Sequence, residues 1–226
     1  MAERARNHTR AAAWLLLLLS VFIFLPSPAK AHRSGKFLGT FHVTYYYFAL
    51  EIAGGNWPLY GVACQTIIAR TSKTFHDLLS LEGAGRLKDG RVVGFEERCD
   101  CAKQGFQGRR TCYSLLDKTL FPWGRGGRIH GQFVSLRPFR SVAVDPNHVP
   151  LGTVLFIPEF KGKRLPNGKR LDGCFRAEDT GALIQGKKLD VFSGFPDWGK
   201  QFQKANPLDR IKVFEGGERC PTILLE

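Results

Sequence analysis

The sequence lacks a long apolar run. Its most apolar stretch, residues 11–25, has about fifteen residues, whereas a membrane-spanning helix needs about twenty. Arginines precede this stretch and small residues follow it at positions 29–31, which is typical of a secretory signal. We therefore predict a cleaved signal over residues 1–31, no stable membrane span afterwards, and a single domain over 32–226. An uncleaved anchor is the alternative.

Acidic residues are scarce relative to basic ones. The chain has 20 Asp and Glu against 33 Lys and Arg, a net charge of +13, and +10 remains once residues 1–31 are set aside. Such an excess favours an anionic polymer as the partner, although solubility alone also accounts for it. For a protein exported to the periplasm or the cell exterior, we expect this polymer to be cell-wall glycan and not nucleic acid.

Two common cofactor signatures are incomplete. Cys99, Cys101 and Cys112 lie close together, but a zinc site of the usual kind has a second pair of ligands at short spacing, and His130 alone does not supply it. The glycine-rich run at 124–127 has no Lys-Ser/Thr after it, which argues against a phosphate-binding loop. We predict no cofactor and no metal.

The six cysteines are even in number. In an exported chain this predicts up to three disulfides, and six cysteines allow fifteen pairings between which the sequence does not choose. Four of them lie in a glycine-broken segment at about 54–127, which we interpret as an insertion whose disulfides compensate for weak local packing. Within it, residues 72–81 are expected to form a short helix.

Most of the remaining chain alternates between short β-type runs and turn residues. The runs favoured as strands are 39–51, 133–136, 141–144, 153–158, 174–178, 187–192 and 211–214, with one further short helix expected over 195–206. Many short strands and few helices favour a mainly β fold, a barrel rather than a layered α/β sheet.

Two aspartates stand out because aspartate is disfavoured in strands and is seldom buried without a partner. Asp179 and Asp190 each adjoin β-type residues, and the loop between them contains Gly181 and Gly186. Because side chains alternate along a strand, Leu189 and Val191 should face one side and Asp190 the other. The pattern indicates a site, although a turn or cap role for each aspartate is the simpler alternative.

Four ordered motifs carry a family resemblance: Ala143-Val144-Asp145, Pro150-Leu151-Gly152-Thr153, Glu178-Asp179-Thr180-Gly181 and Lys188-Leu189-Asp190-Val191-Phe192-Ser193-Gly194. With Thr44-Tyr45-Tyr46-Tyr47 as an opening strand, the chain resembles the 3D (three-aspartate) domain of bacterial cell-wall enzymes, related to the C-terminal barrel of membrane-bound lytic transglycosylase A. The resemblance implies a six-stranded double-psi β-barrel interrupted by the cysteine-containing segment.

The resemblance also implies a reaction and a set of residues. The three family aspartates fall on Asp145, Asp179 and Asp190, and Asp190 matches the acid/base of lytic transglycosylases. These enzymes cleave the β-1,4 bond between N-acetylmuramic acid and N-acetylglucosamine in peptidoglycan glycan strands without water, leaving a 1,6-anhydro ring. The residues expected to bind the substrate are Thr180, Gly181, Lys187, Tyr46 and Trp198. The alternatives are that Lys187 lies on a solvated strand face and that Trp198 belongs to the core or to a lid.

The chemistry of the residues agrees with this role. A glycosidic oxygen leaves only when protonated, so its acid must stay protonated near neutral pH. A neighbouring Asp179 and a groove lined by Phe192 or Trp198 would raise the pKa of Asp190 through repulsion and desolvation. Asp145, which follows Val144 and precedes a proline, is expected to hold its loop or a sugar hydroxyl.

Two other functions remain open at this stage. Asp179-Thr180-Gly181 is also an aspartic protease signature, but those enzymes need two such aspartates, and Glu178 is an unusual neighbour for one. A non-catalytic wall-binding module would use the same barrel to bind polysaccharide without cleaving it. The oligomeric state is undetermined by the sequence.

Overall fold

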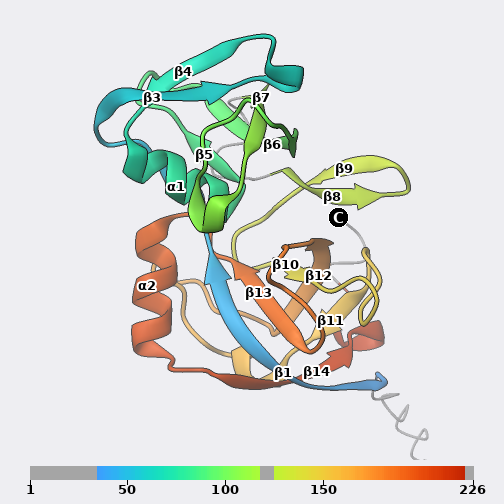
Figure 1. Cartoon of the computed structure of the whole chain (residues 1–226). Coiled ribbons are helices and arrows are strands. Elements are labelled where there is room, and N and C mark those ends of the chain that lie inside the picture. Colours follow the sequence, from blue (N-terminus) through green and yellow to red (C-terminus); the bar gives the residue numbers. More distant parts are fainter. Residues whose placement is uncertain (1–34, 118–124, 222–226) are drawn as a thin grey trace, which may run out of the picture. The chain divides into compact units, whose positions relative to one another are not determined.

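Six short strands close on themselves to form a barrel in the order β1-β13-β10-β12-β11-β14. The computed structural model in which they are seen describes residues 35–117 and 125–221 (Figure 1). The predicted signal at 1–31 lies outside these residues. No helix in the described residues has the length and apolarity that crossing a bilayer requires.

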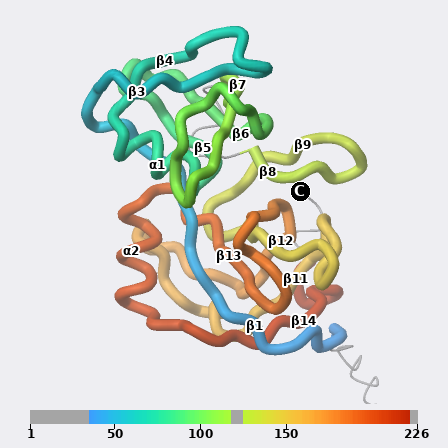
Figure 2. Tube along the Cα trace, in the orientation of Figure 1, coloured from blue at the N-terminus to red at the C-terminus, as the bar shows by residue number. Residues whose placement is uncertain are grey.

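In the barrel, the first strand pairs with strands from the last part of the described chain. β1 (Phe37–Tyr46) pairs in parallel with β13 (Lys188–Phe192) and antiparallel with β14 (Arg210–Glu215). The first strand, blue in Figure 2, therefore lies between two orange to red ones. β10 (Ser141–Val144) is parallel to β12 (Cys174–Asp179) and antiparallel to β13. β11 (Val154–Phe156) closes the barrel between β12 and β14. The predicted mainly β fold with a six-stranded barrel is confirmed.

The barrel interior is filled by alternate residues of its strands. Leu189 and Val191 of β13 are fully buried in this core, as the alternation predicted, and Asp190 is left outside it. The core closes where α2 (Pro196–Ala205) inserts Phe202, whose ring stacks on that of Phe160. α2 and β14 confirm the helix and the last strand expected from the sequence.

The elements between β1 and β10 do not belong to the barrel. A four-stranded sheet in the order β2-β5-β6-β7 comprises Ala49–Leu50, Ala84–Arg86, Val92–Arg98 and Thr111–Leu116, and a two-stranded one comprises β3 (Gly54–Tyr60) and β4 (Ile67–Thr71). We call residues 49–116, with these strands and α1 (Lys73–Glu82), the inserted unit. A hairpin of β8 (Arg125–Ile129) and β9 (Gln132–Ser135) leads back to the barrel.

Helix α1 confirms the helix expected over 72–81. Ser72 caps it by accepting the Phe75 N–H at 3.1 Å, and Gly83 ends it in the left-handed conformation with φ of 83°. One-turn 3-10 helices occur at Val62–Cys64, Phe106–Gly108, Pro158–Phe160 and Gly217–Arg219.

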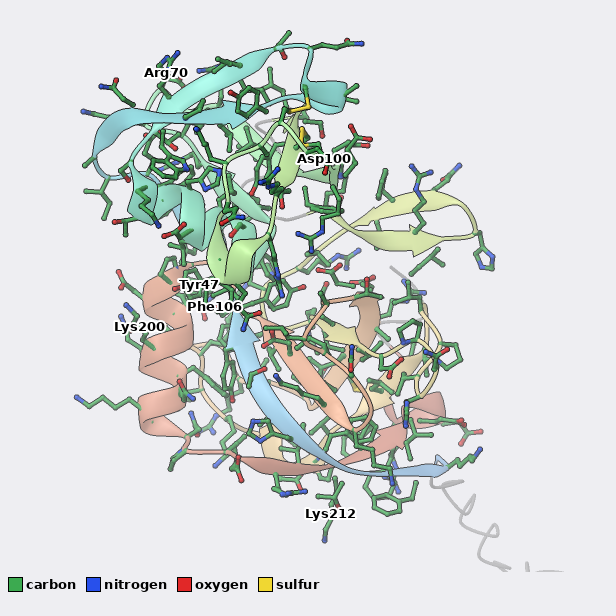
Figure 3. The ribbon with its side chains drawn as sticks, in the orientation of Figure 1. Tyr47, Arg70, Asp100, Phe106, Lys200 and Lys212 are labelled. Carbon is green, nitrogen blue, oxygen red and sulfur yellow. A yellow bond between two sulfur atoms is a disulfide. The ribbon has the colours of Figure 1, made fainter. Side chains whose placement is uncertain are left out.

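All six cysteines form disulfides, as predicted. Cys64–Cys101 and Cys99–Cys112 cross-link the inserted unit, and both appear as yellow bonds near Asp100 in Figure 3. Cys174–Cys220 ties the start of β12 to the turn after β14. Although the four sulfur atoms of the inserted unit lie within 4.8 Å of one another, they are joined as two disulfides, and zinc binds thiolates instead.

Candidate functional site

A cavity of about 390 Å³ is lined by both the barrel and the inserted unit. Its barrel wall includes Asp179 and Asp190, and its opposite wall includes Glu82 and three arginines. The volume falls within the range of small-molecule sites. The full set of lining side chains with polar or aromatic character is Tyr46, Tyr47, Ser80, Glu82, Phe95, Arg98, Arg109, Thr111, Arg125, Phe133, Asp179, Thr180, Asp190 and Phe192.

Strand register places the two aspartates in one row across the barrel. Thr44 of β1 is opposite Asp190 of β13, Asp190 is opposite Ala143 of β10, and Ala143 is opposite Asp179 of β12. Two strand spacings therefore separate the aspartate backbones, roughly 10 Å. Because Ala143 lies between them and lines the cavity, its small side chain leaves the space between the two carboxyls open.

Asp190 is the less engaged of the two carboxyls. Its Oδ1 atom is buried and makes no hydrogen bond of good geometry with the described residues. Burial raises the pKa of Asp190 to about 6, against the smaller lowering effects of the Thr44 hydroxyl and the Lys188 charge. Near pH 6 about half of the Asp190 carboxyls carry a proton. Such a carboxyl can donate a proton to a ligand and later accept one.

Asp179 is held in place from two sides. Its Oδ2 accepts the Tyr46 hydroxyl at 2.9 Å and its Oδ1 accepts the Thr180 N–H at 2.8 Å. The pKa of Asp179 is raised to about 7. Burial is the main cause and the negative charge of Asp190 adds to it, whereas the two hydrogen bonds act in the opposite direction. The expected repulsion is thus seen on Asp179, whereas burial is the main cause of the raised pKa of Asp190.

Glu82 is a third carboxyl of the cavity, and sequence reasoning missed it. It is the last residue of α1, and its Oε2 accepts the N–H of Tyr47, which follows β1 and is labelled in Figure 3. Burial raises the pKa of Glu82 to about 8, and the Asp190 charge raises it as well. Nothing in its local sequence indicates this position, since a glutamate at the end of a helix is ordinarily solvent-exposed.

Asp145, the third predicted aspartate, does not line the cavity. Its Oδ2 accepts the Gly186 N–H at 2.8 Å and its Oδ1 accepts the Asn147 N–H at 2.9 Å. The Gly186 hydrogen bond is the main reason that the pKa of Asp145 is lowered. Asp145 therefore fixes the loop between Asp179 and Asp190, the loop-holding role expected for it, and has no proton to give near neutral pH.

The predicted substrate contacts separate into two groups. Tyr46, Thr180 and Gly181 line the cavity. Trp198 does not, because it packs against the barrel core from α2 and contacts the Phe195 ring at 5.6 Å. Lys187 is also absent from the lining, and it lies instead beside Gly39 of β1. Phe192 does line the cavity, so the aromatic wall comes from β13 and not from α2.

The arginines of the opposite wall were also missed. Arg125 forms an ion pair within the protein, with its Nη2 atom 2.8 Å from Oε2 of Glu96, and its guanidinium lies over the Phe133 ring at 4.3 Å. Arg98 and Arg109 make long hydrogen bonds to neutral oxygens only, those of Thr111 and Ser80. No sequence motif marks them, because they reach the cavity only through the packing of the inserted unit.

The site is thus formed by a closed six-stranded β-barrel that presents two carboxyls of raised pKa to one cavity. Residues 140–203 match the model of the 3D domain family. This segment is therefore similar to the 3D domain family. It runs from β10 into α2 and holds all three predicted aspartates.

Comparisons with known proteins agree with this assignment. The chain is 33% identical over 72 residues to the putative cell wall shaping protein YabE of Bacillus subtilis, a match that spans 32% of this chain and 14% of that one. Its fold is similar to that of MltA from E. coli, solved with bound chitohexaose, with a TM-score of 0.54 and 16% identity over 78% of this chain and 72% of that one.

A second solved structure has the same fold. It is a membrane-bound lytic murein transglycosylase from Agrobacterium tumefaciens, with a TM-score of 0.53 and 16% identity over 79% of this chain and 74% of that one. The resemblance predicted from the aspartate motifs is confirmed, and the similarity extends beyond the 3D segment to most of the chain.

Proposed function

We propose that the protein is a peptidoglycan lytic transglycosylase in which Asp190 acts first as acid and then as base. The observation that carries the proposal is Oδ1 of Asp190, which is buried at a cavity wall and makes no hydrogen bond of good geometry with residues 35–117 and 125–221. Its pKa of about 6 keeps part of the population protonated in the mildly acidic to neutral range. The fold shared with lytic transglycosylases supports the reaction type.

The proposed reaction needs one proton carrier and no water. Asp190 donates its proton to the glycosidic oxygen, and the C1–O bond breaks to give an oxocarbenium-like muramyl residue. The carboxylate left behind removes the proton from the C6 hydroxyl of the same sugar. The O6 atom then bonds to C1, which closes the 1,6-anhydro ring and restores protonated Asp190.

The neighbouring residues have supporting roles in this proposal. Asp179, held by Tyr46 and Thr180, lies across the small Ala143 side chain from Asp190 and would stabilise the positive charge that develops at C1 when it is ionised. A water molecule between the two carboxyls would favour hydrolysis. The sugar ring must therefore fill this space for the anhydro product to form.

We also infer that the protein works outside the cytoplasm, in the bacterial cell envelope. Three disulfides support this, since disulfides form and persist in oxidising compartments. The positive net charge of +13 suits an anionic wall polymer.

The test is incubation of the purified protein with peptidoglycan, followed by mass spectrometry of the soluble products. Wild type is expected to release anhydro-muropeptides, and Asp190→Asn to lose about 10²–10⁴-fold in rate. Asp197→Asn, on the exposed face of α2, is the matched control and should keep full activity. Hydrated reducing ends would show hydrolysis instead, and binding without release would show a wall-binding module. Full activity in Asp190→Asn would disprove its role.

A further inference from the structure

The cavity has a cationic wall whose charges the protein itself does not neutralise. Arg98 ends β6 and Arg109 lies just before β7, and both line the cavity that contains Asp179 and Asp190. Nη1 of Arg98 lies 3.4 Å from Thr111 Oγ1, and Nη1 of Arg109 lies 3.4 Å from the Ser80 carbonyl oxygen. Within residues 35–117 and 125–221, neither forms an ion pair with a carboxylate.

The two glutamates that precede Arg98 are engaged elsewhere. Glu96 pairs with Arg125 at 2.8 Å and accepts the Ser114 hydroxyl at 2.7 Å. Glu97 accepts the Ala63 N–H at 2.7 Å. Asp100, which follows Arg98, forms no ion pair with either arginine in the part of the chain that the structure describes.

Arg98 and Arg109 each pack over an aromatic ring, and they lie near enough for their charges to interact. Arg98 lies over the Phe95 ring at 5.8 Å, and Arg109 lies over the Phe106 ring at 5.9 Å. Partial burial and the Arg98 charge lower the pKa of Arg109, so the two guanidinium groups repel each other in the free protein. An anion between them would relieve this repulsion.

We propose that Arg98 and Arg109 form a subsite for a carboxylate carried as a substituent on the glycan. A guanidinium binds a carboxylate through two parallel N–H donors, which lysine cannot reproduce. One cavity would then hold the sugar backbone against Asp190 and the carboxylate side group against the inserted unit. The identity of the polymer rests on the proposed function. Within it, the carboxylate belongs either to the peptide stem or to the lactyl ether of muramic acid.

The test measures binding and cleavage of soluble glycan strands in three forms. The first keeps its peptide stems, the second is stripped by an amidase so that lactyl carboxylates remain, and the third has those carboxylates converted to neutral methylamides. Binding is measured in an Asp190→Asn background so that the strands stay intact. The variant is Arg98→Gln with Arg109→Gln, and Arg70→Gln with Lys212→Gln is the control of equal charge, because both residues point outward in Figure 3.

We expect the double variant to lose at least about tenfold in affinity for carboxylated strands, with kcat changed less than about threefold and binding of the neutral form unchanged. Loss on the amidase-stripped form alone assigns the lactyl group, because the stem-bearing form holds that carboxyl as an amide. Loss on the first form alone assigns the stem, and loss on both shows that the pair accepts either carboxylate. The subsite is disproved if the variant binds all three forms as the control does, or weakens equally on the neutral form.

Two further results keep the outcomes distinct. Arg98→Lys with Arg109→Lys preserves charge and should bind with intermediate affinity, which separates lost recognition from lost folding. If wild type cleaves none of the strands but binds carboxylated ones through the arginines, the proposed reaction fails and the subsite stands. If wild type cleaves and the glutamine variant matches it on every form, the reaction stands and the subsite fails.

Discussion

The barrel and the inserted unit are stabilised in different ways. The barrel core contains 17 buried residues, whereas the main cluster of the inserted unit contains seven and is supplemented by two disulfides. The two regions also contribute different charges to the cavity: two aspartates from the barrel, and from the inserted unit one glutamate with two arginines that form no ion pair within the described residues. In the function proposed above, the packed core fixes the groups that transfer the proton, and the cross-linked unit presents the groups that recognise the substrate.

The largest effect should come from removing the cross-links of the inserted unit. Replacing its four cysteines by serine is expected to cost about 2–4 kcal/mol for each disulfide and to unfold this unit while the barrel stays folded. Cleavage activity should fall to background because the cavity loses every side chain that the inserted unit supplies, Glu82 included. Amide hydrogen exchange, measured on peptide fragments by mass spectrometry, should become fast over residues 49–116 only.

The matched control removes the disulfide of the barrel. With Cys174→Ser and Cys220→Ser, exchange over residues 49–116 should remain slow, because that unit keeps its own cross-links. Equal loss of protection in both regions would contradict the contrast between a packed barrel and a cross-linked insertion.

The second prediction concerns the space between the aspartates. Ala143→Leu would fill the gap between Asp179 and Asp190 and exclude the sugar ring, so cleavage should fall by about 100-fold or more, with the barrel still folded. Product release from soluble strands measures this, and circular dichroism checks the fold. Ala53→Leu, at an exposed loop position, is the control. Normal activity of Ala143→Leu would show that the substrate does not pass between the carboxyls.

The third prediction is a pH dependence of stability that involves both walls. The pKa values of Asp190, Asp179 and Glu82 are raised to about 6, 7 and 8. A carboxyl whose pKa is raised in the folded state contributes stability below the unfolded value near 4, and this stability is lost as pH rises from about 4 to the folded values of 6 to 8. The free energy of unfolding should therefore decrease over that window.

Glu82→Gln tests the share of the inserted unit in this effect. Because the amide cannot ionise, the variant should lose less stability between pH 5 and 8.5 than wild type, by about 1–2 kcal/mol. Urea unfolding at several pH values measures the difference, and Asp197→Asn, an exposed change on α2, is the control. A variant with the wild-type pH dependence would show that Glu82 is ionised at little cost.

The smallest effect is expected from Tyr46→Phe. Removing this hydroxyl takes away a hydrogen bond that favours ionised Asp179, so the pKa of Asp179 should rise further. We expect about a tenfold loss in kcat together with a shift of the pH–rate profile to higher pH. Tyr60→Phe, which lies in the inserted unit outside the cavity lining, should change neither. An unshifted profile would mean that Tyr46 has only a packing role.

Much of the barrel could be predicted because its strands follow local rules. The alternation of Leu189, Asp190 and Val191 predicted which face the aspartate takes, and both short helices were located from their apolar spacing and turn residues. For Asp145, its place before a proline predicted that it holds its loop or a sugar hydroxyl, and it accepts the N–H of Gly186, 41 residues away. Whether Trp198 faces a core or a cavity could not be predicted, because an aromatic residue on a helix has the same local pattern in both cases.

The sequence by itself determined the residue types of the site, the side of β13 from which Asp190 points, and the need for disulfides in the cysteine-containing segment. The tertiary structure alone decided that Ala143 separates the two aspartates, that Glu82 and two arginines face them, and which cysteines pair. The physical reason is that side-chain direction along one strand depends on its own alternation. Register between strands, by contrast, is fixed by pairing of segments as distant in sequence as β1 and β13, where Thr44 is opposite Asp190.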